Sequence, residues 1–301
     1  MITLLDLAKR TGNDQLVGLI EEALGFAPEL RTLPIRPIAG TSYKTLVRTA
    51  FGEGGFRGAN EGTSFIKSQY AQRLVECFFF DAMMQIDEQL VSADPLLLTD
   101  EATGAVNGSF INLGRQIYSG KANDGKGFDG YKNRIAAEMI VDAEGTGEAT
   151  ETIYFVVEGT QGVHLPMGEN AMLELGTWMR QKVTDADGKS FMAFINNLRA
   201  WIGLQVGHKY AIGAIKNVTN AKPLTDSLGA ELMTKFPVGM VPTRAFMSRN
   251  SRFYLQRSRS SVGAQKSNSA GDTFAPTPTE ISGVPIQVTD SILPVAANSW
   301  A

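Results

Sequence analysis

The chain has 301 residues, of which 43% are hydrophobic and 20% are charged, a composition typical of a globular protein with one large or two modest cores. Its 28 basic and 31 acidic residues leave a net charge of −3, so global charge gives no reason to expect a dedicated nucleic-acid binder. The single cysteine, Cys77, excludes an intramolecular disulfide. No signal peptide opens the chain and no apolar run is long enough to span a membrane, so we expect a soluble protein made in a reducing cytoplasm.

Residues 1–39 are predicted to form short amphipathic helices followed by a connector. Thr3 and Asp6 make an N-cap pattern, and the apolar residues from Leu16 to Leu24 fall on one helical face. Three prolines between residues 28 and 37 favour an extended, stiff chain. We therefore expect this segment to be an arm that takes no part in the core.

A long β-hairpin is predicted next. Residues 41–51 alternate with the period of two of a strand, and a glycine-rich tip, whose glycines permit positive φ, ends at residues 60–62. Neither face is apolar enough to pack on a core, and a lone hairpin is marginal in water. We therefore expect another subunit to stabilise it. The hairpin residues that we expect to contact that subunit are Lys44, Arg48, Arg57, Asn60 and Glu61.

The middle of the chain mixes helices and strands. The apolar run from Val75 to Met84 predicts a buried strand, within which Cys77 is expected to be unreactive. Residues 99–119 have helical spacing and end at Gly120, where a C-terminal cap is expected. Further strands are predicted at 153–157, 191–206 and 210–218, with a short helix-like stretch at 171–178.

The last third is predicted to contain an amphipathic helix at 224–236, a strand at 243–248, a helix at 251–257, a surface loop at 258–278 and a strand at 283–290. Because these elements are interspersed without a βαβ rhythm, we predict an α+β fold. Five arginines lie between Arg244 and Arg259 with no acid among them. We expect them to form a solvated or subunit-contacting face, with Arg252 and Arg257 at the contact.

The sequence predicts no catalytic, cofactor or metal site. Residues 120–126 have the spacing of a phosphate-binding loop, but Gly127 replaces the required Ser or Thr and no helix follows. Residues 185–189 resemble part of a calcium loop without its distant bidentate acid, so a tight turn is the favoured interpretation. His164 and His208, with one cysteine, do not match a zinc spacing.

Two sequence patches, together with the order of elements, resemble the major capsid proteins of tailed phages. TSYKTLVRT at 41–49 and GFRGANEG at 55–62 are similar to the strand and tip of the E-loop in one branch of that family. SGVPIQVTD at 282–290 is similar to a strand near the end of many such shell proteins. The resemblance implies the Hong Kong 97 fold, with an N-terminal arm at 1–39, the E-loop at 40–72, mainly P-domain at 73–221 with a spine helix at about 99–119, and mainly A-domain at 222–301; the assignment of 130–220 between the P- and A-domains stays open.

The resemblance also implies a function. It implies a capsid protein that assembles into hexamers and pentamers around phage double-stranded DNA, in the host cytoplasm and then in the virion. The implied partners are further copies of the chain, scaffolding, portal and decoration proteins, and DNA held by non-specific contact. One branch of the family joins a lysine to an asparagine, and Lys44, Lys67 and Asn60 lie in the hairpin, but without a matching catalytic acid we expect no crosslink.

Two alternatives stay open. One is the shell of an encapsulin-like nanocompartment, which would share the fold and enclose a cargo enzyme. The other belongs to a different class, a cytoplasmic enzyme or ligand-binding domain, and the missing site chemistry disfavours it.

Overall fold

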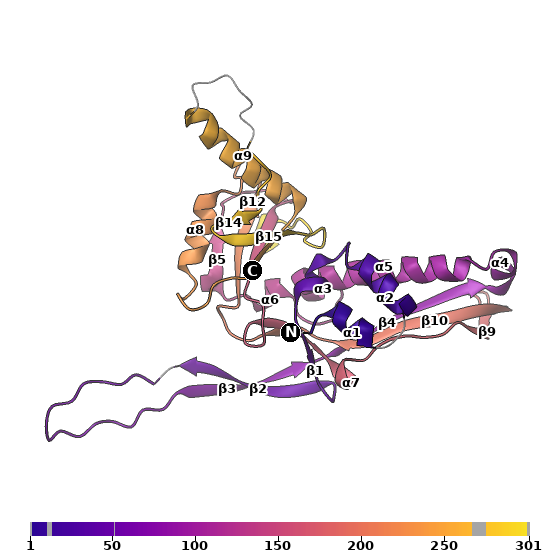
Figure 1. Cartoon of the computed structure of the whole chain (residues 1–301), viewed down its shortest axis with the longest axis horizontal. Helices are drawn as coiled ribbons and strands as arrows, with labels where there is room; N and C mark the ends of the chain where they lie inside the picture. The colour runs from indigo at the N-terminus through magenta and orange to yellow at the C-terminus, as the bar shows by residue number, and fades with distance from the viewer. Residues whose placement is uncertain (1, 11–13, 51, 267–274, 300–301) are drawn as a thin grey trace.

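The computed structural model of the chain describes residues 2–10, 14–50, 52–266 and 275–299, and it has three parts (Figure 1). A globular lobe carries α8 (Asp226–Thr234) and α9 (Arg249–Lys266). An elongated lobe contains the longest helix, α5 (Leu97–Ser119). A hairpin of β2 (Ser42–Ala50) and β3 (Gln69–Glu76) projects away from both lobes (Figure 1).

The remaining elements connect these parts. The other helices are α1 (Leu4–Arg10), α2 (Asp14–Ala23), α3 (Pro28–Thr32), α4 (Glu88–Ala93), α6 (Tyr131–Arg134) and α7 (Gly168–Ala171), with 3₁₀ turns at Gly120–Ala122, Ala137–Met139 and Ala297–Ser299. The other strands are β1 (Ile35–Pro37), β4 (Phe78–Asp87), β5 (Ile140–Asp142), β6 (Glu151–Val156), β7 (Val163–Met167), β8 (Leu173–Leu175), β9 (Met179–Thr184), β10 (Ser190–Ile202), β11 (Gln205–Val206), β12 (Ile212–Val218), β13 (Arg244–Met247), β14 (Glu280–Ile281) and β15 (Val284–Val288).

The elongated lobe is a sheet with one covered face. Its strands run in the order β1-β7-β10-β4, with β8 and β9 also paired to β10 and β11 to β7. The predicted helix at 99–119 is confirmed as α5, and one apolar stripe of it is buried, which includes Val106, Phe110 and Ile117. The prediction of a continuously buried strand is wrong for β4, because its side chains alternate and Phe79 and Met83 stay exposed.

The N-terminal helices belong to the main core. Leu4, Ile20 and Leu30 are fully buried in the same apolar cluster as the stripe of α5, and α2 packs on α5. The expectation of an arm outside the core is therefore wrong, because the apolar face of α2 is buried against this helix. The connector is also shorter than predicted, since α3 begins at Pro28 and only β1 is extended.

The globular lobe is built on a sheet that is buried on both faces. Its order is β14-β15-β13-β6-β12-β5. Along β6, Ile153 and Phe155 pack in a second core near α8, whereas Tyr154 and Val156 face the core of the elongated lobe. The sheet therefore joins strands from residues 140–156 and 212–218 to the C-terminal strands. The predicted strands at 153–157, 191–206, 210–218, 243–248 and 283–290 and the helix at 224–236 are confirmed.

Two local predictions are wrong. The expected helix at 171–178 is β8 instead, and α7 before it is a left-handed turn in which Glu169, Asn170 and Ala171 all have positive φ. The expected surface loop from residue 258 begins as helix, because α9 continues to Lys266. Serine hydroxyls of this helix donate to backbone carbonyls one turn earlier. The segment has no apolar periodicity from which a helix could be predicted. Residues 267–274 of that loop lie outside the described residues.

Candidate assembly interface

The hairpin departs from the body as a two-stranded ribbon. Its strands pair antiparallel from Ser42 opposite Glu76 to Ala50 opposite Gln69, with one register shift near the far end. Beyond the strands, residues 52–68 form an extended loop that turns at Asn60, with φ of 65°. The turn lies where the sequence predicts it, and Asn60 rather than one of the tip glycines adopts the positive φ, which asparagine tolerates.

The root of the hairpin is fixed to the elongated lobe. The Tyr43 hydroxyl lies 3.2 Å from Nε2 of the buried His164, and the Arg36 guanidinium stacks 4.5 Å from the Tyr43 ring. On the other strand, Arg73 donates to the carbonyl of Val206 at 3.2 Å. Burial, with a smaller contribution from the nearby Arg36 charge, lowers the pKa of His164 to about 4, so this imidazole is neutral at neutral pH. These contacts hold both strands at the base and leave the tip free.

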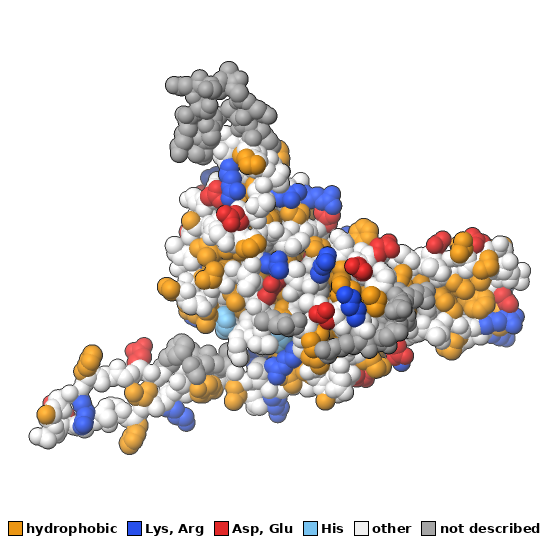
Figure 2. All heavy atoms as spheres, in the orientation of Figure 1, with side chains coloured by type: hydrophobic (Ala, Val, Ile, Leu, Met, Phe, Trp, Pro, Cys, Tyr) orange, Lys and Arg blue, Asp and Glu red, His pale blue; other side chains and the backbone are white. Residues whose placement is uncertain are grey.

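Large apolar side chains stand exposed along the outer hairpin. Phe56 and Phe65 are fully exposed, Leu46 is 68% exposed, and Ile66 is 55% exposed. Figure 2 shows isolated hydrophobic side chains protruding along this projection. Burying one such side chain is worth about 1.5–3 kcal/mol, so the tip gains free energy when a partner covers it. Sequence reasoning missed these residues because it sought a continuous apolar face.

The charged tip residues bond to the backbone of the tip. Arg57 donates to the carbonyl of Glu61 at 2.6 Å, and one Glu61 carboxylate oxygen accepts the backbone N–H of Gly58 at 2.9 Å. The two predicted contact residues are thus brought together, and they shape the turn. Lys44 and Asn60 are exposed, as an intermolecular contact requires. The side chain of Arg48 lies outside the described residues.

The uncovered face of the elongated sheet is a second exposed apolar surface. Phe79, Met83 and Met179 are each more than half exposed on it, and the ring of Phe79 packs 5.1 Å from that of Trp201. An open groove of about 450 Å³ includes Met83 and Met179 in its lining. We call this surface the open sheet face. Side chains alternate between the two faces of β4, and Phe79 and Met83 lie on the same face. This pattern was the sequence signal for an exposed apolar face, and sequence reasoning overlooked it.

Most arginines between residues 244 and 259 are paired within the chain. Arg244 bonds Glu158 at 3.1 Å, Arg249 bonds Asp290 at 2.5 Å, and Arg259 bonds Asp226 at 2.7 Å. Arg257 donates to the Asn220 carbonyl at 2.7 Å and also to its side chain. Arg252 is half-buried and has no side-chain partner among the described residues, so of the two expected contact residues it keeps the freer guanidinium.

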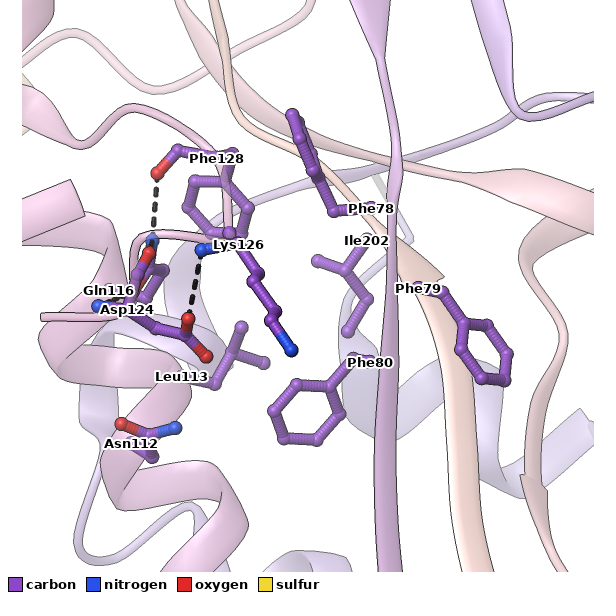
Figure 3. A pocket seen from close by; sticks show the side chains of 11 residues that line it. Phe78, Phe79, Phe80, Asn112, Leu113, Gln116, Asp124, Lys126, Phe128 and Ile202 are labelled. Carbon is purple, nitrogen blue, oxygen red and sulfur yellow. Dashed lines mark hydrogen bonds between the residues drawn. The ribbon is translucent and has the colours of Figure 1, made fainter. Parts of the chain in front are cut away.

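A small pocket between β4 and α5 offers no reactive chemistry among the described residues. It measures about 70 Å³, far below the 300 Å³ or so of a small-molecule site, and is lined mainly by apolar side chains such as Phe78, Phe80 and Leu113 (Figure 3). The side-chain amide of Gln116 holds the neighbouring loop, because it donates to the carbonyl of Phe128 at 2.8 Å. The Lys126 side chain extends toward Phe80, and the side chains that line the pocket form no anion cradle around it (Figure 3).

The candidate ligand motifs are structural turns. Gly120, with φ of 57°, caps α5 as expected, and a 3₁₀ turn rather than a helix N-terminus follows it. Residues 185–189 form the predicted tight turn between β9 and β10, in which Asp185 accepts two backbone N–H groups. Among the described residues there is no group of three or more potential metal-binding side chains. No helix in the described ranges is long and apolar enough to cross a membrane.

Cys77 lies between β3 and β4, where it is 6% exposed and its thiol donates to the carbonyl of Pro166 at 3.4 Å. Burial raises the pKa of Cys77 to about 11, so the thiol is protonated at neutral pH. The structure thus places the cysteine in the buried setting that the sequence predicts.

Comparison with known proteins agrees with this architecture. The model of the family described as major capsid protein GP7 matches residues 36–296. No curated protein matches the chain. A solved structure of bacteriophage Epsilon15 superposes with a TM-score of 0.63 at 17% identity, covering 90% of this chain and 88% of that one. The capsid of bacteriophage JBD30 superposes with a TM-score of 0.51 at 11% identity, covering 89% and 92%.

The nanocompartment alternative has weaker support. The encapsulin from Synechococcus elongatus PCC 7942 superposes with a TM-score of only 0.46 at 10% identity, over 64% of this chain and 87% of that one. The family match, by contrast, spans most of the chain, and the two phage structures superpose on 90% and 89% of it. The chain therefore belongs to the major capsid protein GP7 family and has the Hong Kong 97-type capsid fold.

Proposed function

We propose that copies of this chain pack into hexamers and pentamers that close around phage double-stranded DNA, and that the hairpin is the arm that joins neighbouring copies. The supporting observation is a hairpin fixed at its root by Tyr43 and Arg73 and otherwise unsupported, with fully exposed Phe56 and Phe65 near its tip. A ribbon with this much free apolar surface is unstable alone in water and gains from a partner.

The partner surface that fits is the open sheet face of another copy. The hairpin projects away from its own elongated lobe, so its tip is far from its own open sheet face (Figure 1). A contact between different surfaces on two copies is heterologous, and such contacts close into rings when the rotation between copies permits. Rings of this kind are the geometry of hexamers and pentamers. The tip and the open sheet face each expose aromatic or methionine side chains, which such a contact would bury.

The hairpin is tested by removing it. Replacing Thr45 to Lys67 with a short linker keeps the root contact of Tyr43 while deleting the exposed tip. We expect folded subunits that fail to form shells in sedimentation and electron microscopy. A matched variant, Phe56→Ser with Phe65→Ser, keeps the ribbon and removes its apolar tip, and we expect it to weaken assembly in the same direction. Shells of normal yield and size from the deletion would refute the proposed role.

The arginine segment is proposed to contribute to contacts between copies. Most of its guanidinium groups are already neutralised within the chain, which leaves little charge to hold phosphates. Arg257 bonds only the neutral Asn220, and Arg252 has no side-chain partner among the described residues. We propose that Arg252 meets a carboxylate of a neighbour, with DNA held only non-specifically. Arg252→Gln should then lower the melting temperature of shells more than it lowers genome retention. Normal melting combined with selective loss of DNA would place Arg252 on the inner surface instead.

Further partners are inferred from the family alone. We propose scaffolding, portal and decoration proteins as partners, assembly in the host cytoplasm, and a purely structural role without catalysis. The hairpin residues Lys44, Lys67 and Asn60 are exposed, and we propose that no lysine–asparagine crosslink joins the copies. Denaturing electrophoresis of mature particles tests this, since a monomer band is expected and a ladder would contradict it.

A further inference from the structure

A buried carboxyl lies where the two lobes meet. Glu29 is on α3, has no exposed surface, and belongs to no ion pair among the described residues. It reaches the segment that follows β15, where the Thr289 hydroxyl donates to its Oε2 at 2.8 Å. Because Thr289 follows the C-terminal strand of the globular lobe, this hydrogen bond ties the N-terminal helices to that lobe.

The other carboxyl oxygen lies against α5. A Cβ added at Gly114 would stand 2.2 Å from Glu29 Oε1 and 2.4 Å from the hydroxyl oxygen of Ser291. Glu29 Oε1 and the Ser291 hydroxyl oxygen are both buried, and neither has a hydrogen-bond partner of good geometry among the described residues. The missing side chain of Gly114 thus creates the slot that holds them. One carboxyl therefore joins three elements, α3, α5 and the segment after β15.

The surroundings of this carboxyl contain no compensating cation among the described residues. The titratable groups that face it are Asp290, Tyr118 and Tyr131, and Glu158 lies beside the two tyrosines. Asp290 and Glu158 form ion pairs with Arg249 and Arg244 respectively, so these arginines are already engaged. The hydroxyls of Tyr118 and Tyr131 are buried and have no hydrogen-bond partner among the described residues. Burial therefore raises the pKa of Glu29, although the hydroxyls of Ser291 and Thr289 offset part of the effect.

We propose that Glu29 is a protonated carboxyl lock that holds the globular lobe on the elongated lobe, and that its ionisation loosens this joint. In the locked state Oε2 accepts from Thr289, and a proton on Oε1 supplies the donor for the Ser291 hydroxyl oxygen. Loss of that proton leaves a buried anion beside Asp290 with no cation to pair with, which favours separation of the three elements and entry of water. The lock is a property of one subunit and does not depend on where the hairpin docks.

The sign of the pH effect follows from the direction of the shift. A carboxyl that binds its proton more tightly in the folded subunit contributes stability that is fully present below its ordinary pKa. That contribution is lost as pH rises toward the raised pKa of the folded state. The joint is therefore tight in acid and loosens toward alkaline pH, which gives the angle between the lobes a dependence on proton concentration.

The protonation state can be observed directly in unassembled subunits. The infrared difference spectrum between wild type and Glu29→Gln at neutral pH should contain the carbonyl stretch of one protonated carboxylic acid, lost in the variant. Glu21→Gln, which changes an exposed glutamate on the neighbouring α2, should leave that band in place. Absence of the band in wild type would show that Glu29 is ionised and would overturn the proposal.

Hydrogen exchange measures whether ionisation of Glu29 loosens the joint between the lobes. At each pH, the exchange of amides in residues 289–292 is compared between wild type and Glu29→Gln, which cannot ionise. We expect the wild-type rate to rise relative to the variant as pH increases, while Glu21→Gln follows wild type. A ratio of wild-type to Glu29→Gln exchange rates that does not change with pH would overturn the proposal. Should Glu29→Gln fail to fold, Thr289→Val serves instead, since removing the Oε2 donor must shift the infrared band, and an unshifted band would count against the proposal.

Discussion

At the residue scale, glycines that look equivalent in the sequence have opposite roles in the structure. Gly104, Gly108 and Gly114 all lie within α5, where each lowers helix propensity by about 1 kcal/mol relative to alanine. A Cβ at Gly104 or Gly108 would meet nothing within 4 Å. At Gly114 the same atom would overlap the carboxyl of Glu29 and the hydroxyl of Ser291. Only the folded arrangement distinguishes a tolerated glycine from a required one.

Alanine substitution at these positions gives the first prediction. Gly104→Ala should stabilise the subunit against denaturant by about 0.5–1 kcal/mol, because it restores helix propensity in open space. Gly114→Ala should destabilise it by about 1–3 kcal/mol, because the added methyl forces buried polar groups apart. Gly108→Ala is the matched control and should behave like Gly104→Ala. Equal effects at all three positions would contradict the described packing around Gly114.

Cys77 gives a second prediction at this scale. Its thiol is protonated and buried, and only the thiolate reacts, so a thiol reagent should label native subunits slowly. Denaturant should make labelling fast. The matched control is Asp187→Cys, which adds a second thiol in the exposed turn before β10, where labelling of the native subunit should be fast. Rapid labelling of Cys77 in native wild type, at the rate of the added surface thiol, would contradict the buried setting.

At the scale of elements, the root of the hairpin is the part that sequence reasoning could not supply. Period-two alternation predicted the first strand of the hairpin, which the structure confirms as β2. The partners that fix its direction, His164 and Val206, are more than 100 positions away from the residues that they bind. The same limit explains the N-terminal helices, whose amphipathic pattern was recognised while the α5 surface that covers it was not. Patterns within an element predict its type, and long-range contacts decide what it packs on.

His164 gives a prediction for this root. Its folded pKa of about 4 lies below the ordinary value of 6.5, so its contribution to stability is present above pH 6.5 and is lost as pH falls toward 4. The slope for one such group is about 1.4 kcal/mol per pH unit. His164→Gln should flatten the dependence of unfolding free energy on pH in this window. Tyr43→Phe should keep the slope, since burial rather than the tyrosine sets the shift; a flattened slope in that variant would assign the effect to the hydrogen bond.

At the scale of the whole molecule, the chain combines two packed lobes with an arm that its own body leaves unsupported. The fold class and the family resemblance were predicted from the sequence because the hairpin and the terminal strand have local patterns. The division into two sheets was not, because β5, β6 and β12 join strands that follow much later in the chain. The apolar tip and the open sheet face were also missed, since their side chains are spread among polar neighbours. In the proposed assembly, both surfaces act only in contact with a second copy of the chain.

The central claim is that the hairpin tip of one copy lies on the open sheet face of another. The direct measurement places a photo-reactive amino acid at Phe65, mixes subunits of two isotopic labels before assembly, and maps the crosslinks of purified shells by mass spectrometry. We predict crosslinks between differently labelled chains, from residue 65 to the neighbourhood of Met83 and Met179, and none in unassembled subunits. Crosslinks confined to one chain, or shells in which residue 65 reaches no other copy, would contradict the account.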